Sequence, residues 1–99
     1  MDTDRLSPAD VASKLIGLYS LPFGGKASGR FRISPKNLRR LSGRRRLSDE
    51  FVQQLAEELF ELDYVFVDLG TYYVMTNTRA FANYRRVSDA LLAQGTRTG

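Results

Sequence analysis

The stretch from residue 48 to residue 62 limits the fold more than any other part of this 99-residue chain. Its apolar residues recur at helical spacing and form a broad stripe, which is typical of an amphipathic helix. Ser48 precedes the stripe and can cap the helix, and Asp49 and Glu50 follow where the helix dipole favours negative charge. The sequence therefore predicts one continuous helix over residues 48–62. The stripe consists of Phe51, Val52, Leu55, Ala56, Leu59, Phe60 and Leu62.

Two segments rich in β-branched and aromatic residues follow this helix. They cover residues 64–69 and 72–75 and flank Gly70 and Thr71, so they predict a β-hairpin. Successive side chains of a strand point to opposite faces, and for this reason we expect one residue of the adjacent tyrosine pair to be exposed. That pair is Tyr72 and Tyr73.

The C-terminal part of the chain predicts a final helix that begins at residue 77 or 78 and ends at Gly95. Ser88 and Asp89 offer an alternative, because they can cap a separate short helix. The apolar residues that recur on one face of the expected helix are Phe81, Tyr84, Val87 and Leu91.

Two further helix starts lie in the first half of the chain, where Ser7 precedes a proline and Ser34 precedes another. Serine at the N-cap followed by proline at the first helical position is typical of a helix start. The first of these helices is expected to stop before Pro22. The second is expected to be short and to end before Gly43, and residues 30–33 between the two helices alternate as a short strand does.

The expected elements follow the order helix, short strand, short helix, turn, longer helix, β-hairpin and helix. This order resembles that of the winged helix-turn-helix superfamily. Residues 34–42 and 48–62 would be the two helices of the motif, and residues 64–75 would be the wing. The resemblance implies an α+β fold with three to four helices and a small β-hairpin wing.

The resemblance covers residues 7–93, nearly the whole chain. We therefore expect a single winged-helix domain over residues 1–99, ordered from about residue 6 to about residue 94. Residues 1–5 and 96–99 are expected to be flexible.

Composition excludes several kinds of chemistry. The chain has no cysteine and no histidine, which removes thiol nucleophiles, imidazole bases and the usual metal ligands. No apolar run approaches the roughly 20 residues that a membrane span needs, and the polar start of the chain is unlike a signal peptide. We therefore expect a cytoplasmic protein that is not an enzyme and has no metal, no cofactor, no small-molecule substrate and no membrane partner.

Charge is strongly segregated along the chain. Residues 30–47 hold eight basic residues and no acid, whereas residues 48–78 hold seven acids and no basic residue. A basic segment of this density suits a partner made of phosphates, and double-stranded DNA is the first partner that we consider. The residues expected to contact phosphate are Lys36, Arg39, Arg40, Arg44, Arg45 and Arg46.

The resemblance adds an expectation about DNA bases. In that superfamily the second helix of the motif usually enters the major groove, and here its exposed N-terminal residues would face the bases. These residues are Ser48, Asp49, Gln53 and Gln54. On this hypothesis the protein is a transcriptional regulator or accessory factor, and the turn at residues 43–47 brings its arginines beside Ser48.

The acidic segment supports a second hypothesis. Glu57, Glu58 and Glu61 are expected on one exposed face, which DNA phosphates would repel, and the wing carries no cation that would attract phosphates. The alternative is a winged-helix module for protein–protein interaction, in which this acidic face binds a protein partner or a second copy of the chain. Such an adaptor, inhibitor or dimerisation domain would not bind DNA.

Overall fold

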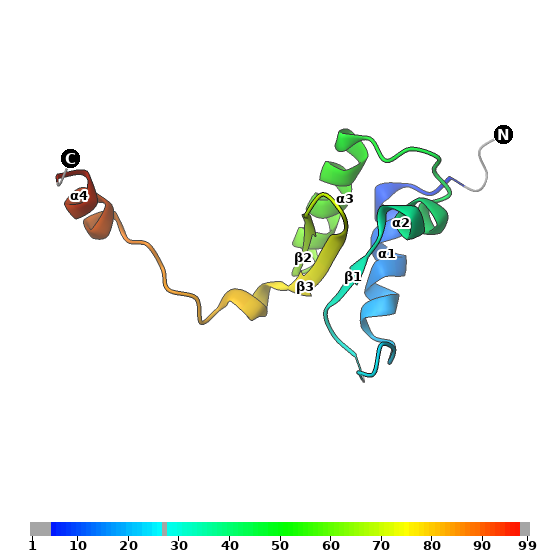
Figure 1. Ribbon diagram of the computed structural model, residues 1–99, viewed down its shortest axis with the longest axis horizontal. Coiled ribbons are helices and arrows are strands. Elements are labelled where there is room, and N and C mark those ends of the chain that lie inside the picture. Colours follow the sequence, from blue (N-terminus) through cyan, green and yellow to red (C-terminus); the bar gives the residue numbers. More distant parts are fainter. Residues whose placement is uncertain (1–4, 27, 98–99) are drawn as a thin grey trace.

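Three helices and a small antiparallel sheet pack together, and a C-terminal segment extends away from them (Figure 1). The computed structural model describes residues 5–26 and 28–97. Within these residues the fold is α+β, with four α-helices and one three-stranded antiparallel sheet. The elements are α1 (Pro8–Tyr19), β1 (Phe31–Ile33), α2 (Pro35–Ser42), α3 (Asp49–Glu61), β2 (Tyr64–Asp68), β3 (Tyr73–Asn77), the 3₁₀ helix η1 (Thr78–Phe81) and α4 (Asp89–Arg97).

Serine side chains begin the first three helices, as the sequence predicts. The hydroxyl oxygens of Ser7, Ser34 and Ser48 each accept a hydrogen bond of 3.1 Å from a backbone N–H three residues later. These bonds satisfy amides that a helix start otherwise leaves without a partner. Gly43 ends α2 with φ 70, a left-handed conformation that glycine adopts without strain.

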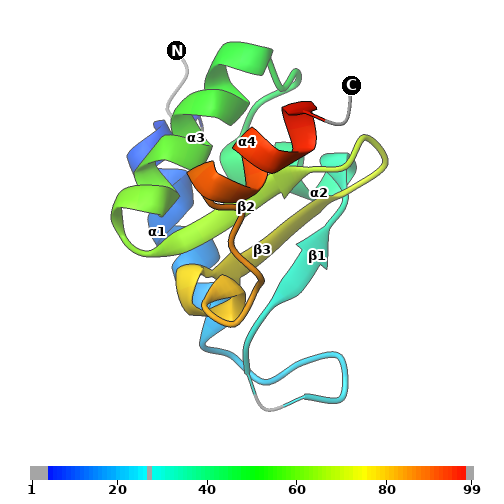
Figure 2. The same ribbon diagram turned by 90° about the vertical axis from the view of Figure 1, so that its left-hand side faces the viewer.

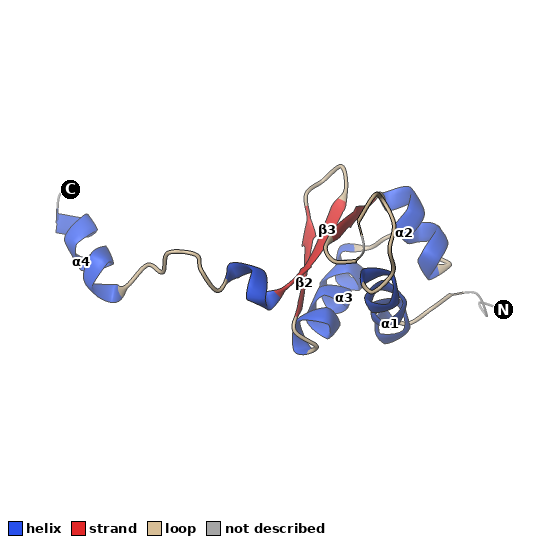
Figure 3. Cartoon of the chain, turned by 90° about the horizontal axis from the view of Figure 1, so that it is seen from below, coloured by secondary structure: helices blue, strands red, loops and turns tan. Residues whose placement is uncertain are grey.

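The sheet has the strand order β1-β3-β2, and both pairs are antiparallel. Phe66 of β2 lies opposite Met75 of β3, and both side chains are buried. Only Leu62 and Asp63 connect α3 to β2. Asp63 has φ 71, and its carbonyl oxygen accepts a 3.0 Å hydrogen bond from the N–H of Thr78. Figure 3 shows α1 and α3 together on one side of the strands.

The core takes side chains from α1, α2, α3, β2 and β3. α3 lies at its centre, because it packs on α1 and on β2. Leu15 of α1 and Leu55 and Leu59 of α3 are completely buried. The full set of buried apolar residues is Val11, Ala12, Leu15, Leu38, Phe51, Leu55, Leu59, Phe66, Tyr73 and Met75.

The predicted apolar stripe of α3 is wrong at its C-terminal end. Phe60 and Leu62 are 64 % and 53 % exposed, whereas Leu55 and Leu59 fill the core. Successive helical residues point about 100° apart, so Phe60 lies beside the solvent-facing residues rather than with Leu59. In the hairpin, Tyr73 is buried and Tyr72 is half-buried. The ring of Tyr72 is partly covered by Arg32, whose guanidinium carbon lies 5.2 Å from the ring centroid.

The prediction of one continuous helix from residue 77 to Gly95 is wrong. The chain forms η1 first, and α4 then begins at Asp89 and runs to Arg97, past the expected end at Gly95. The alternative helix start is confirmed, since the Ser88 hydroxyl oxygen accepts a 3.2 Å hydrogen bond from the N–H of Leu91. All described side chains from residue 79 to residue 94 are exposed, and a helix without packing is marginally stable.

We refer to residues 82–97 as the arm and to the preceding described residues as the body. The radius of gyration of the chain is 17.0 Å, whereas a compact domain of about 100 residues has about 13 Å. The longest dimension is 58 Å, against 32 Å and 24 Å for the other two. Figures 1 and 3 show the arm leaving on the β2 side, away from α1 and α2. The ends expected to be flexible fall mostly outside the described residues, at 1–4 and 98–99.

The packing of the core predicts that substitutions at two positions on α3 change the free energy of unfolding by very different amounts. Leu55→Ala should lower the free energy of unfolding by about 2–5 kcal/mol, because it opens a cavity at a completely buried site. Gln54→Ala, on the exposed side of the same helix, should change it by about 0.5 kcal/mol or less. Urea denaturation followed by circular dichroism measures both values. Equal losses for the two variants would contradict the described packing of α3.

Candidate functional site

The turn between α2 and α3 ends directly at the start of α3, where Ser48 caps the helix (Figure 1). The backbone N–H of Arg44 donates a 3.1 Å hydrogen bond to the carbonyl oxygen of Arg39, which closes the end of α2. Ser42 is completely buried, and its carbonyl oxygen accepts a 3.0 Å hydrogen bond from the N–H of Leu6. The turn is therefore held against the N-terminal segment, and its arginines follow α2 and precede α3.

Arg44 was expected to contact phosphate, but its side chain makes contacts within the chain. Its Nη2 donates a 2.9 Å hydrogen bond to the carbonyl oxygen of Leu6, and its guanidinium carbon lies 4.0 Å from the centroid of the Phe51 ring. Burial lowers the pKa of Arg44, and the positive charge of Arg5 lowers it further. Arg44 thus connects the N-terminal segment, the turn and α3 through its Nη2 and the face of its guanidinium, while its buried Nε has no hydrogen-bond partner among the described residues.

The other expected phosphate ligands are available to a partner. Lys36, Arg40, Arg45 and Arg46 are exposed and Arg39 is half-buried. None of the five takes part in an ion pair with any residue that the structure describes. They lie on α2 and on the turn that follows it, so this part of the chain carries five cations without an ion pair among the described residues.

Tyr73 marks the place where the basic and acidic segments meet. Burial raises the pKa of its phenol, the carboxylates of Asp68 and Asp49 raise it further, and the charge of Arg39 opposes them. Three elements therefore bring charged groups close to one hydroxyl: α2, the first turn of α3 and the end of β2. The Tyr73 ring is stacked on Phe66, with 5.3 Å between centroids and 9° between planes.

The residues expected to face DNA bases lie along the first turns of α3. Asp49, Gln53 and Gln54 are exposed, whereas the Ser48 hydroxyl oxygen already accepts the hydrogen bond that caps the helix. Nε2 of Gln53 donates a long hydrogen bond of 3.5 Å to Oε2 of Glu57. Three polar side chains at the start of α3 are thus exposed, and one of them, Gln53, is hydrogen-bonded to Glu57.

The acidic face is narrower than expected. Glu57 and Glu61 are exposed one turn apart, but Glu58 is half-buried and does not share their full exposure. In its place Phe60 is exposed beside them. Within the described residues, no three His, Cys, Asp or Glu side chains come together as a metal site would require.

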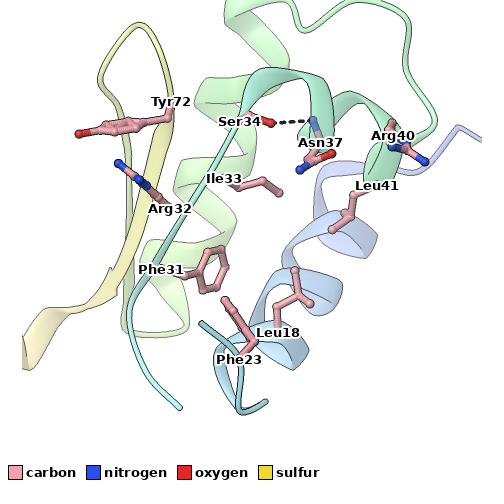
Figure 4. A pocket seen from close by; sticks show the side chains of 10 residues that line it. All are labelled: Leu18, Phe23, Phe31, Arg32, Ile33, Ser34, Asn37, Arg40, Leu41 and Tyr72. Carbon is pink, nitrogen blue, oxygen red and sulfur yellow. Dashed lines mark hydrogen bonds between the residues drawn. The ribbon is translucent and has the colours of Figure 1, made fainter. Parts of the chain in front are cut away.

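An apolar groove of about 750 Å³ lies between the end of α1, β1 and α2 (Figure 4). We call it the β1–α2 groove. Arg32 and Arg40 lie at its edges, and the Phe23 and Phe31 rings, 5.9 Å apart, are part of its lining. Sequence reasoning missed this groove, because it depends on a loop that returns Phe23 to β1. The apolar lining consists of Leu18, Phe23, Phe31, Ile33 and Leu41.

A second apolar groove, of about 490 Å³, lies between α3 and β2, and we call it the α3–β2 groove. Its lining includes Phe60 and Val65, with Glu57 and Glu61 beside them. Phe60 is the residue that could have indicated this groove from the sequence. Helical spacing instead assigned Phe60 to the core.

Comparisons with known proteins add no relative. No protein-family model, curated protein or solved structure matches the chain. None of the described helices combines the length and the apolar character that crossing a membrane requires.

The contacts of Arg44 predict a structural role. Arg44→Ala should lower the free energy of unfolding by about 1–3 kcal/mol, because it removes a charged hydrogen bond and a cation–π contact. Arg45→Ala, at the exposed neighbour, should have an effect of about 0.5 kcal/mol or less. Arg44→Lys should restore only part of the loss, because an ammonium cannot reproduce the planar guanidinium. Urea denaturation of the three variants measures their free energies of unfolding. An unchanged free energy of unfolding for Arg44→Ala would rule out the structural role of Arg44.

The raised pKa of Tyr73 predicts a loss of stability at alkaline pH. The folded state keeps the phenol proton at a pH where the unfolded chain, with a pKa of about 10, releases it, so stability falls above about pH 10. Tyr73→Phe should remove this contribution, and Asp68→Asn should weaken it by lowering the pKa of Tyr73. Urea denaturation at about pH 8 and about pH 11 measures the change. A Tyr73→Phe variant that loses as much stability as the wild type over this range would contradict the assignment.

Proposed function

We propose that this protein is a small winged helix-turn-helix DNA-binding protein that acts as a transcriptional regulator or accessory factor. The order of elements from α1 to β3, together with the strand order β1-β3-β2, supports this class. In this proposal α2 and α3 are the two helices of the motif, and the β2–β3 hairpin is the wing.

The observation that carries the proposal is the group of five cations on α2 and the turn before α3, none of which forms an ion pair with a described residue. These cations would contact DNA phosphates, which fixes the position of the protein on the duplex and supplies much of its affinity. Arg44 has no part in this contact, because its guanidinium is occupied by Leu6 and Phe51. The five cations are Lys36, Arg39, Arg40, Arg45 and Arg46.

The acidic residues of α3 limit how the helix can enter DNA. A helix rises about 1.5 Å per residue, so Glu57 lies about 12 Å along the axis from Asp49, and Glu61 lies about 18 Å from it. The major groove is about 8.5 Å deep. A helix that enters end-on by its first turns therefore keeps Glu57 and Glu61 outside the groove, where phosphate repulsion is weaker. Gln53 and Gln54 would be near the bases, where glutamine pairs with adenine.

A second candidate function is a protein-interaction module that does not bind DNA. The observation that favours it is the α3–β2 groove, whose lining includes the exposed Phe60 together with Glu57 and Glu61. An exposed aromatic ring with carboxylates around it is suited to a partner that presents apolar and basic side chains. The two functions are separated by variants of the two surfaces.

Duplex binding tests the first function through its dependence on salt. Five phosphate contacts predict that log K falls with log salt with a slope of about −4.5. The Arg45→Ala, Arg46→Ala double variant should reduce the slope by about 2 and weaken binding. Lys14→Ala on the exposed side of α1 is the control and should change nothing. Fluorescence anisotropy with a short mixed-sequence duplex measures the slopes, and absence of salt-sensitive binding at low ionic strength would reject the proposal.

Neutralising the acidic face distinguishes the two functions further. Glu57→Gln with Glu61→Gln should tighten duplex binding, because it removes repulsion from phosphates. If the protein is an interaction module, the same double variant leaves duplex binding absent and weakens protein association instead.

A further inference from the structure

The arm exposes more apolar surface than an isolated segment normally does. Leu91 and Leu92 of α4 are 50 % and 58 % exposed, and Val87 before them is exposed as well. Tyr84 of the arm packs edge-to-face on Phe81 at the end of η1, with 5.1 Å between ring centroids, and both rings stay exposed. A contiguous apolar series of this kind marks a surface that another surface covers.

The arm is also basic. Arg85 and Arg86 lie in the extended stretch before α4, and Asp89 is the single acid between residue 82 and residue 94. The surface that covers the arm must therefore combine apolar side chains with negative charge. This requirement selects between the two apolar grooves of the body.

The α3–β2 groove meets the requirement and the β1–α2 groove does not. The α3–β2 groove has Phe60 and Val65 in its lining and Glu57 and Glu61 beside them. The β1–α2 groove is larger but carries Arg32 and Arg40 at its edges, which would repel Arg85 and Arg86.

We propose that the arm of one copy docks into the α3–β2 groove of a second copy, so that two chains form a dimer by exchanging their arms. The arm leaves its own body and places α4 apart from it (Figures 1 and 3), so that α4 lies in front of the body in the end-on view of Figure 2. Because arm and groove belong to the same chain, a twofold axis lets each copy use both, and the assembly closes at two chains.

The size of the contact suits a stable dimer. The arm has thirteen residues with described side chains, 82–94, and the groove has seven lining residues, so each copy offers up to about 20 residues for the contact. Standard interfaces use roughly 20–30 residues on each side. The dimer leaves the five cations on α2 and the turn outside the contact, so this inference does not depend on the proposed DNA binding.

Charge reversal tests the exchange directly. One variant carries Arg85→Glu and Arg86→Glu in the arm, and the other carries Glu57→Arg and Glu61→Arg in the groove. Each variant alone places like charges together in both contacts, so its dimer should dissociate about tenfold or more readily than the wild type. An equimolar mixture should restore the dimer, because each reversed arm then meets a reversed groove and each native arm meets a native groove.

Size-exclusion chromatography with light scattering over a range of protein concentration gives the mass, which should rise from the 11.2 kDa of one chain to twice that value. Leu91→Gln with Leu92→Gln should also weaken the dimer, by about a hundredfold or more, while keeping residues that favour a helix. Lys14→Glu on α1 is the charge control and should leave the dimer intact.

Three results would overturn the proposal. The first is a wild-type protein that stays monomeric at every concentration. The second is a dimer that neither charge reversal weakens. The third is a mixture of the two reversed variants that remains monomeric, whereas a single chain with all four changes behaves as the wild type does; this would place the arm in the groove of its own chain.

Discussion

Leu55 and Leu59 lie where α3 packs against α1 on one side and against β2 on the other, and both are completely buried. A helix held by two core residues one turn apart has no freedom to rotate about its axis. The positions of Glu57, Phe60 and Glu61 on the solvent side follow from that packing, because each residue of a helix advances by about 100°. The start of α3 is placed in the same way, and with it the turn that carries the arginines.

The segregation of charge along the chain becomes a segregation in space. α2 and the turn after it carry cations without ion pairs among the described residues, while the exposed face of α3 carries carboxylates. The two regions meet at Tyr73, whose phenol is close enough to Arg39, Asp49 and Asp68 for all three charges to act on its pKa.

Local patterns predicted the secondary structure of the body well. A serine cap followed by apolar residues at helical spacing determines a helix start whatever surrounds it, so the starts of α1, α2 and α3 were foreseeable. The exposure of Phe60 was not, because periodicity identifies an apolar face without showing how wide the covering surface is.

The parts that sequence reasoning missed depend on contacts between distant residues. The hydrogen bond from Arg44 to Leu6 spans 38 positions, and no local pattern distinguishes Arg44 from Arg45 or Arg46. The loop that brings Phe23 to Phe31 is equally hidden, since its course is set by packing. The prediction for the C-terminal segment was wrong for a related reason. Its apolar residues have helical spacing, but no part of the body covers them.

The link between α3 and the hairpin has a mechanical consequence. It consists of two residues, and the carbonyl oxygen of Asp63, whose backbone is left-handed, accepts a hydrogen bond from Thr78 at the end of the hairpin. The end of α3 and the base of the hairpin are therefore joined by a short link and by a hydrogen bond. A partner that binds both elements costs the protein little conformational entropy. The partner must therefore fit the shape that this surface already has.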